Sequence, residues 1–363
     1  DTSPLGWSPD GKQILLDRHD RATQHLGIYD LESGSTRWLD LPGGVYGGHR
    51  HPRFGRPREI VTEWEDLSHP PQVVSIDATT GEVTPVLSGN SVEMPKRTWQ
   101  PITFLSSDGQ AVQAWLALPD GKGPFPTILE THGGPEGVRM AGYNPEALTW
   151  LDHGFAFVSV NYRGSTTFGK AFQDQIKGNF GYWELEDMAA CRRFLVQQGI
   201  ADPGKVFLTG YCYGGYLTLL ALGKQPDLWC GGMAGGAIAD WRMVYEGSTE
   251  SGRLITRAYF NGSPEERPDL YRDRSPITYT RQVCVPVFSW MGEQDTHVTT
   301  QQLKTYLDEL AVLGKPVEAI WYSGGHGGSF DVTGQPVDIL ARQILFVQQV
   351  LKGVYNQRQE HLP

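Results

Sequence analysis

A cysteine between glycines is the first feature of this sequence that could do chemistry. Residues 210–215 read Gly-Tyr-Cys-Tyr-Gly-Gly. They follow an apolar run at 206–209 and precede an apolar segment at 213–222, so we expect a strand, a sharp turn and a helix. This is the setting of the Gly-x-Ser-x-Gly nucleophile elbow, with Cys in place of Ser. A helix N-terminus and a neighbouring imidazole both favour a thiolate, so the pattern predicts a reactive thiol at Cys212.

Two possible partners for this thiol occur later in the chain, each just after a predicted strand. Asp295 comes first and His326 second, which gives the nucleophile, acid and histidine order of the hydrolase fold. In such an arrangement Asp295 orients the imidazole of His326, which takes the thiol proton and later delivers it to the leaving group. Glu293 and Asp331 are rival candidates for the acid.

Backbone N–H groups are expected to stabilise the oxyanion that forms during such a reaction. Residues 132–135, His-Gly-Gly-Pro, follow a predicted strand at 126–131 and resemble the His-Gly-Gly loop that supplies one donor. The second donor is the N–H of Tyr213, directly after the nucleophile.

The first 95 residues show strand patterns and almost no helical spacing. An Asp, a turn and a Gly between two strand-like runs occur twice, and the two glycines, Gly34 and Gly81, lie 47 residues apart. That period falls within the range of propeller blades, so we expect two blades. Because a propeller needs about four to eight blades, the rest is missing from this chain, or another chain supplies it, or the region is a degenerate β-cap.

Strands and helices alternate from residue 96 to residue 363. This alternation predicts an α/β domain with a mostly parallel sheet covered by helices on both faces. Strands are expected at 112–118, 126–131, 155–160, 206–209, 285–290 and 317–322, and helices at 184–197, 213–222, 301–313 and 337–351.

Composition narrows the classes of partner. The chain has 363 residues with a formal net charge of −10, which argues against nucleic acid and anionic membranes as main partners. Neither a secretory signal nor an apolar run of about 18 residues is visible, so we expect a cytoplasmic protein without a membrane span. Four cysteines are too few for a disulfide scaffold, and no metal or cofactor motif occurs. The start at Asp1, within a strand-like segment, suggests a processed or trimmed product.

Seven short stretches of the C-terminal part resemble the prolyl oligopeptidase family, specifically its acylaminoacyl-peptidase-like branch. They are residues 132–135, 161–165, 213–221, 239–241, 274–277, 314–318 and 325–327. The resemblance implies an α/β-hydrolase domain preceded by a β-propeller, catalytic roles for Cys212, Asp295 and His326, and oxyanion donors at Gly134 and Tyr213. It also implies a peptide or small acyl compound as substrate.

Two departures from the family affect the site. The family nucleophile is Ser, and here it is Cys212; the family often has Arg two residues after the catalytic Asp, and here that position is His297. A fixed cation is thus replaced by a titratable group. Further candidates for substrate contacts are Trp241 and Tyr245, as pocket walls, and Arg163, which either holds a loop or contacts a substrate carbonyl.

The cysteine leaves three interpretations open. It belongs to a natural cysteine hydrolase that cleaves peptide, amide or ester bonds. Alternatively, it belongs to an acyltransferase or cyclising enzyme, because a thioester reacts with amines more readily, relative to water, than an ester does. The third interpretation is a Ser→Cys substitution that traps an acyl-enzyme. A non-catalytic binding protein is a further hypothesis, and a homo-oligomer is possible.

Overall fold

The computed structural model describes residues 2–48, 50–87, 95–327 and 338–355. They fall into two compact units. The first contains Asp1–Pro101 with two later segments, Val138–Thr149 and Thr166–Gly169. The second contains Ile102–Gly137, Trp150–Ser165 and Lys170–Pro363. Asp331, one of the rival acids, lies outside the described residues.

The first unit consists of two antiparallel sheets. One has the order β1-β2-β3-β4, from β1 (Thr2–Trp7), β2 (Gln13–Asp20), β3 (Thr23–Asp30) and β4 (Ser35–Trp38). The other has the order β5-β7-β8-β9, from β5 (Val45–Tyr46), β7 (Glu59–Glu65), β8 (Gln72–Asp77) and β9 (Val83–Leu87), and β6 (Arg53–Phe54) pairs with β7. Apolar side chains of both sheets share one buried cluster. Sequential antiparallel strands of this kind are typical of propeller blades.

The turn that repeats in the sequence is also repeated in the structure. Asp30 accepts the N–H of Gly34 on its backbone oxygen and that of Ser33 on its carboxylate. Asp77 accepts the N–H of Gly81 on its backbone oxygen and those of two threonines on its carboxylate. Both glycines have positive φ, 66° and 79°, which glycine adopts without steric cost.

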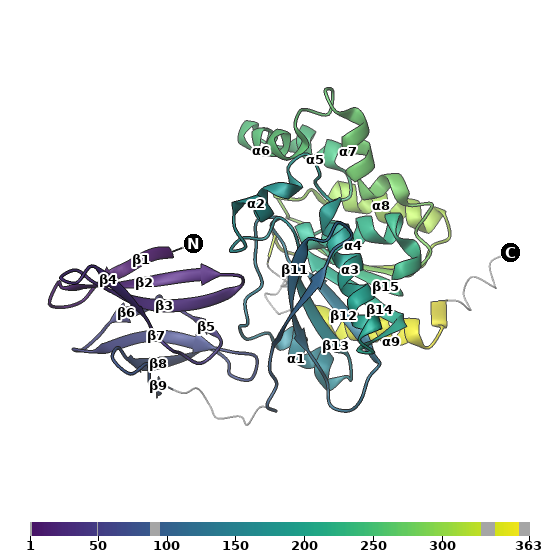
Figure 1. Ribbon diagram of the computed structural model, residues 1–363. Helices are drawn as coiled ribbons and strands as arrows, with labels where there is room; N and C mark the ends of the chain where they lie inside the picture. Colours follow the sequence, from purple (N-terminus) through teal and green to yellow (C-terminus); the bar gives the residue numbers. More distant parts are fainter. Residues whose placement is uncertain (1, 49, 88–94, 328–337, 356–363) are drawn as a thin grey trace. The chain divides into compact units, whose positions relative to one another are not determined.

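The second unit is built on an eight-stranded sheet (Figure 1). Its strand order is β10-β11-β13-β12-β14-β15-β16-β17. The strands are β10 (Gln100–Leu105), β11 (Ala111–Ala117), β12 (Phe125–Thr131), β13 (Ala156–Asn161), β14 (Ala201–Tyr211), β15 (Gly231–Gly235), β16 (Val287–Gly292) and β17 (Val317–Tyr322). From β13 to β17 all neighbours are parallel, and β11 is antiparallel to β13. The carboxyl ends of the parallel strands therefore lie along one edge, where α/β proteins place their sites.

Helices connect these strands. They are α1 (Pro145–Asp152), α2 (Lys170–Gln173), α3 (Trp183–Gln197), α4 (Tyr213–Lys224), α5 (Trp241–Gly247), α6 (Glu250–Phe260), α7 (Pro268–Arg274), α8 (Thr300–Val312) and α9 (Ile339–Leu351). The helix α4 packs on β14 and β15 and is buried over nearly its whole length. Within the described part of the chain, no helix is both long and apolar enough to cross a membrane.

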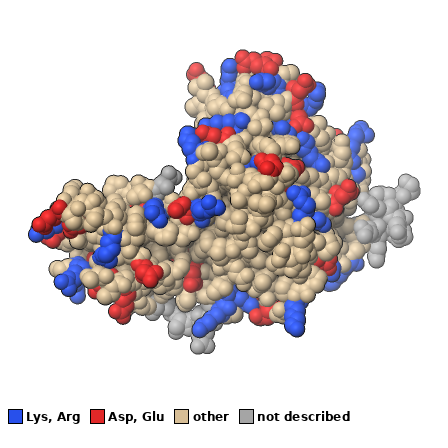
Figure 2. Space-filling model, in the orientation of Figure 1, with Lys and Arg blue, Asp and Glu red and all other residues tan. Residues whose placement is uncertain are grey.

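Charged side chains of both signs are interspersed on the face drawn in Figure 2. The visible face therefore offers mixed charge rather than a field of one sign.

Close packing of α4 on the sheet gives a test of the fold. A Cβ at Gly214 would overlap the backbone oxygen of Thr131, whereas a Cβ at Gly247 would meet nothing within 4 Å. We expect Gly214→Ala to lower the free energy of unfolding by about 1–3 kcal/mol, because overpacking forces the backbone to shift. The control Gly247→Ala should change it by less than about 1 kcal/mol. Urea denaturation of both variants measures the difference, and equal midpoints would contradict this packing.

Candidate active site

Cys212 occupies a sharp turn between β14 and α4. Its backbone has φ 58° and ψ −117°, a conformation that a residue with a side chain rarely adopts. The turn is held by two hydrogen bonds: the N–H of Cys212 donates to the oxygen of Gly235 at 2.8 Å, and the N–H of Tyr216 donates to the oxygen of Cys212 at 3.0 Å. The strained turn places the thiol at the N-terminus of α4, where the partial positive charge of the helix favours an anion.

The glycines around Cys212 have a steric reason. A Cβ at Gly210 would overlap the backbone of Gly214, and a Cβ at Gly215 would lie 2.6 Å from the oxygen of Gly235. The hydroxyl of Thr131 also donates to the oxygen of Gly214 at 3.0 Å. The strands and the helix thus approach so closely that only glycine fits at positions 210, 214 and 215.

Asp295 and His326 are in direct contact. Their loops follow β16 and β17, and Nδ1 of His326 lies 2.7 Å from Oδ2 of Asp295. The other carboxylate oxygen accepts the N–H groups of His297 and Val298 at 2.8 and 2.9 Å. The side chain of Asp295 is fully buried, whereas Glu293 is exposed. Of the two candidate acids within the described residues, Asp295 is the one that contacts the histidine.

The surroundings of His326 favour its protonated form. Hydrogen bonding to Cys212 raises the pKa of His326 to about 9, with Asp295 adding to the rise and partial burial opposing it. The imidazole therefore keeps its proton to higher pH than a free histidine does, and it lies between a sulfur and a carboxylate. This is the charge arrangement expected of a cysteine nucleophile and its base.

The His-Gly-Gly loop is fixed by hydrogen bonds of its own histidine. Nδ1 of His132 lies 2.7 Å from the oxygen of Gly133, and Nε2 lies 2.8 Å from the hydroxyl of Ser165. Its ring stacks on Tyr162, whose hydroxyl donates to the oxygen of His132 at 2.6 Å. The loop that carries Gly134 thus follows β12 and lies against the elbow, since a Cβ on Gly133 would meet the Cβ of Cys212 at 3.6 Å.

Tyr213, the second expected donor, is the first residue of α4. The first N–H groups of a helix have no acceptor within the helix, so they are available to an oxyanion. Its side chain is buried and its hydroxyl donates to Glu184.

The guanidinium of Arg163, considered either as a loop anchor or as a contact to a substrate carbonyl, lies inside the second unit. Its side chain is fully buried and paired with Asp187, which is also fully buried, at 2.6 Å. The remaining N–H groups donate to Ser106, Asp108 and Gln175. Because every donor of the guanidinium has an acceptor inside the unit, none is left for a substrate carbonyl. Of the two roles considered, holding the loop after β13 is the one that its contacts support.

The two aromatic candidates differ in exposure. Trp241 is 6% exposed and packs within a buried aromatic cluster that contains Phe180, Tyr213, Tyr216 and Phe260. Tyr245, on the same helix, is half-buried, with the guanidinium of Arg253 over its ring. Trp241 is therefore part of the core, and Tyr245 is the more accessible of the two candidates.

His297 lies beside the candidate triad. Its ring centroid is 5.0 Å from that of His326, and it is exposed. It also lines a cavity of about 180 Å³, together with Met243, Val244, Gly247, Ser248, Thr249, Gly252, Thr296, Thr299 and Gln302. This cavity is thus adjacent to the histidine that would carry the proton.

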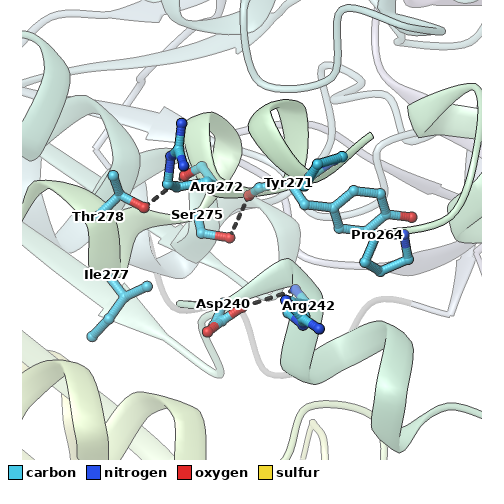
Figure 3. A pocket seen from close by; sticks show the side chains of 9 residues that line it. Asp240, Arg242, Pro264, Tyr271, Arg272, Ser275, Ile277 and Thr278 are labelled. Atoms are coloured by element: carbon cyan, nitrogen blue, oxygen red, sulfur yellow. Dashed lines mark hydrogen bonds between the residues drawn. The ribbon is translucent and has the colours of Figure 1, made fainter. Parts of the chain in front are cut away.

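A larger cavity of about 290 Å³ lies beside α5 and α7 (Figure 3). The hydrogen bonds drawn there are internal to the chain: Asp240 caps α5 by accepting the N–H of Arg242, and Ser275 donates to the oxygen of Tyr271. Neither Cys212, Asp295 nor His326 lines it. The volume of a cavity therefore does not identify the candidate active site. The positions of the reactive side chains do.

Tyr211 is a functional candidate that the sequence did not reveal. Its hydroxyl accepts the N–H of Gly327 at 3.0 Å, and its ring centroid is 5.2 Å from that of His326. The residue before the nucleophile thus fastens the loop that carries the histidine. No signal in the sequence marks this contact, because it joins positions 116 residues apart. Within the described residues, no group of three or more His, Cys, Asp or Glu could hold a metal ion.

Comparison with models of protein families shows which family this chain resembles. The model of the prolyl oligopeptidase family matches residues 142–354, more than half of the chain. The chain belongs to the prolyl oligopeptidase family. A model of acetyl xylan esterase also matches residues 77–182. The predicted family and the predicted α/β-hydrolase fold class are confirmed.

Curated members of the family are similar over most of this chain but are much longer. The acylamino-acid-releasing enzyme of Sus scrofa is 26% identical over 340 residues, which cover 88% of this chain and 46% of that enzyme. The dipeptidyl aminopeptidase BIII of Pseudoxanthomonas mexicana is 27% identical over 245 residues, which cover 62% of this chain and 35% of that enzyme. The chain thus spans about half the length of the acylamino-acid-releasing enzymes that it matches.

Solved structures agree with the fold. A puromycin-hydrolyzing peptidase of Mycobacterium tuberculosis has a TM-score of 0.80 at 25% identity, covering 94% of this chain and 53% of that one. An acylaminoacyl peptidase of Pyrococcus horikoshii has a TM-score of 0.81 at 23% identity, and the match covers 96% of this chain and 56% of that one. Both coverages extend over most of the sheet-rich first unit, whose strands are consistent with a partial propeller-like domain.

The buried pair of Arg163 and Asp187 predicts a large effect on stability. Arg163→Ala leaves the carboxylate of Asp187 buried and unpaired, so we expect the free energy of unfolding to fall by about 3–5 kcal/mol. The matched control is Arg242→Ala, which breaks an exposed pair with Glu246 and should leave the free energy of unfolding nearly unchanged. Urea titrations measure both, and a small effect at Arg163 would refute its structural role.

Proposed function

We propose that this chain is a hydrolase of peptide, amide or ester bonds that works through an acyl-enzyme on Cys212. In this proposal His326 is the base and Asp295 orients it. The observation that carries the proposal is the 2.7 Å contact between Asp295 and His326 beside a cysteine held in a strained turn at a helix N-terminus. These groups meet at one edge of the sheet although they come from three separate loops.

The chemistry follows from the charges of these groups. The sulfur attacks the acyl carbon, and the carbonyl electron pair moves onto oxygen, where the N–H groups of Gly134 and Tyr213 stabilise it. The imidazolium of His326 then protonates the leaving group as the tetrahedral species collapses to a thioester. The neutral imidazole next takes a proton from water, whose oxygen attacks the thioester and releases the acid.

The relatives suggest the class of substrate. They are named acylamino-acid-releasing enzyme, dipeptidyl aminopeptidase and puromycin-hydrolyzing peptidase. We propose a short peptide or small acyl compound here. The replacement of Arg by His at position 297 removes a permanent cation, so the binding of the peptide end should differ from that in the relatives.

Sulfur at position 212 favours a second candidate function, transfer of the acyl group to an amine. A thioester reacts with amines more readily, relative to water, than an oxygen ester does. The same groups would serve, with His326 accepting the proton of the incoming amine in place of water. A Ser→Cys substitution that slows hydrolysis would also accumulate the thioester, and the Cys212→Ser variant separates that case.

Mass spectrometry of the intact protein tests the proposal. The chain is incubated with an acyl-peptide, an acyl-thioester and a chromogenic ester, with and without an added amine. We expect an acyl adduct on Cys212 that decays to the free acid; capture by the amine in preference to water would favour the second function. No adduct and no alkylation by iodoacetamide at neutral pH would refute both. Higher peptidase activity in Cys212→Ser would identify the cysteine as the altered residue.

The pH profile gives a separate prediction. A raised pKa means that His326 keeps its proton to higher pH, so kcat/KM should fall as pH rises through about 9, where the general acid is lost. In Cys212→Ser the main cause of the rise is removed, and a serine needs a neutral imidazole, so activity should instead increase as pH rises through the histidine pKa. If kcat/KM of the wild type already falls as pH rises through about 6.5, the ordinary pKa of histidine, the coupling between His326 and Cys212 is contradicted.

A further inference from the structure

Glu184 is a buried carboxyl group that the proposed chemistry does not use. It lies in the first turn of α3, and its side chain is fully buried. Burial raises the pKa of this carboxyl to about 7, with hydrogen bonds from Tyr213 and Gly181 opposing the rise. A carboxyl group at the start of a helix is stable in water, so complete burial carries a cost that requires a reason.

The contacts of Glu184 lead to the elbow. Its Oε1 accepts the hydroxyl of Tyr213 at 2.5 Å and the N–H of Gly181 at 3.1 Å. Its Oε2 has no hydrogen-bond partner among the described residues. Half of this carboxyl is thus left unsatisfied, while the other half is used to hold a tyrosine that directly follows the nucleophile.

Tyr213 is restrained along its whole side chain. It is 1% exposed, and its ring centroid lies 4.8 Å from that of Phe180, 5.1 Å from that of Tyr216 and 6.4 Å from that of Tyr162. The hydrogen bond to Glu184 fixes the far end of the ring. A side chain held at its ring and at its tip fixes the direction of its Cα–Cβ bond, and with it the backbone torsions of the residue.

The peptide between Cys212 and Tyr213 is where this restraint acts. Its orientation depends on the ψ of Cys212, −117°, in a turn whose φ of 58° is strained. Strained backbone persists only where the surroundings determine it from several sides. This peptide carries the N–H assigned to the oxyanion, so any relaxation of the turn would rotate that donor away.

We propose that Glu184 is a positioning residue that holds the Tyr213 hydroxyl and thereby keeps the Tyr213 N–H directed at the oxyanion. This inference rests on the proposed function, since it concerns the same oxyanion. It assigns Glu184 no contact with substrate. It requires only a hydrogen-bond acceptor at Oε1, so glutamine can replace the glutamate and alanine cannot.

Three variants separate this role from simple packing. Glu184→Ala removes the acceptor, Glu184→Gln keeps it, and Tyr213→Phe removes only the hydroxyl. The matched control is Tyr306→Phe, because Tyr306 is also fully buried and its hydroxyl has no partner among the described residues. Should Glu184→Ala fail to fold, Tyr213→Phe and Glu184→Gln still carry the test.

Three measurements are made on each variant. Hydrolysis of a chromogenic ester gives kcat and KM. The affinity for a peptide aldehyde reports on the oxyanion, because the sulfur bonds to the aldehyde carbon and the carbonyl electron pair moves onto oxygen in the site. The rate of alkylation of Cys212 by iodoacetamide reports on the thiol alone, since that reaction forms no oxyanion.

Loss of one oxyanion donor typically costs about 10²–10³ in rate, so a misdirected donor should lower kcat about 10- to 100-fold in Glu184→Ala and Tyr213→Phe. KM and the alkylation rate should stay within about twofold, and aldehyde affinity should fall in parallel with kcat. Glu184→Gln should restore kcat to within about threefold of the wild type, and Tyr306→Phe should not change it.

The inference is overturned if Glu184→Ala keeps kcat and aldehyde affinity while the protein merely melts earlier. It is also overturned if only KM rises, or if Glu184→Gln is as impaired as Glu184→Ala. A failure of the proposed function looks different, because the wild type itself would then form no adduct and bind no aldehyde. In that case the inference fails with it.

Discussion

The strained backbone of Cys212 is the constraint on which the rest of the site depends. A residue with a side chain holds φ 58° only if the chain on both sides is fixed. That condition requires β14 and α4 to meet at a closeness that excludes any Cβ at Gly210, Gly214 or Gly215. It also explains why α4 is buried along nearly its whole length, since a loosely docked helix would let the turn relax.

Two sets of polar contacts near this turn hold the neighbouring loops of the site. The network of Arg163 and Asp187 holds the segment after β13, whose Ser165 contacts the ring of His132 and so supports the Gly134 loop. Tyr211 fastens the loop of His326 through the N–H of Gly327. These contacts support the loop of the proton carrier and the oxyanion loop from separate elements. The site is therefore pre-arranged by interactions within one unit, as electrostatic stabilisation of a transition state requires.

The sequence predicted the strands that are followed by residues of a recognisable catalytic type. Cys212, Asp295 and His326 could be found because glycine spacing and chain order mark them. β15 was not predicted as a strand, because its residues Gly-Gly-Met-Ala-Gly have low strand propensity. They are small because a Cβ at Gly232 would meet Leu222 of α4 at 2.6 Å, and one at Gly235 would overlap the ring of Trp290.

The sequence does not predict which charged side chains are buried. An arginine after a strand and a glutamate in a first helical turn are usually solvated, so neither Arg163 nor Glu184 indicated its place in the interior. Their partners, Asp187 for one and Tyr213 for the other, lie 24 and 29 residues away. Likewise, segments 138–149 and 166–169 join the first unit although they interrupt the second in sequence.

The proposed chemistry depends on an imidazolium at His326 that donates one ring N–H to the sulfur of Cys212 and the other to the carboxylate of Asp295. An NMR titration of the ring nitrogens of His326 tests this most directly. Hydrogen bonding to Cys212, and then to Asp295, raises the pKa of His326, so the wild type should titrate with a midpoint of about 9. In Cys212→Ser the midpoint should move down, because the larger cause is removed. A midpoint near the ordinary 6.5 in the wild type, unchanged in Cys212→Ser, would contradict the coupling of His326 to Cys212.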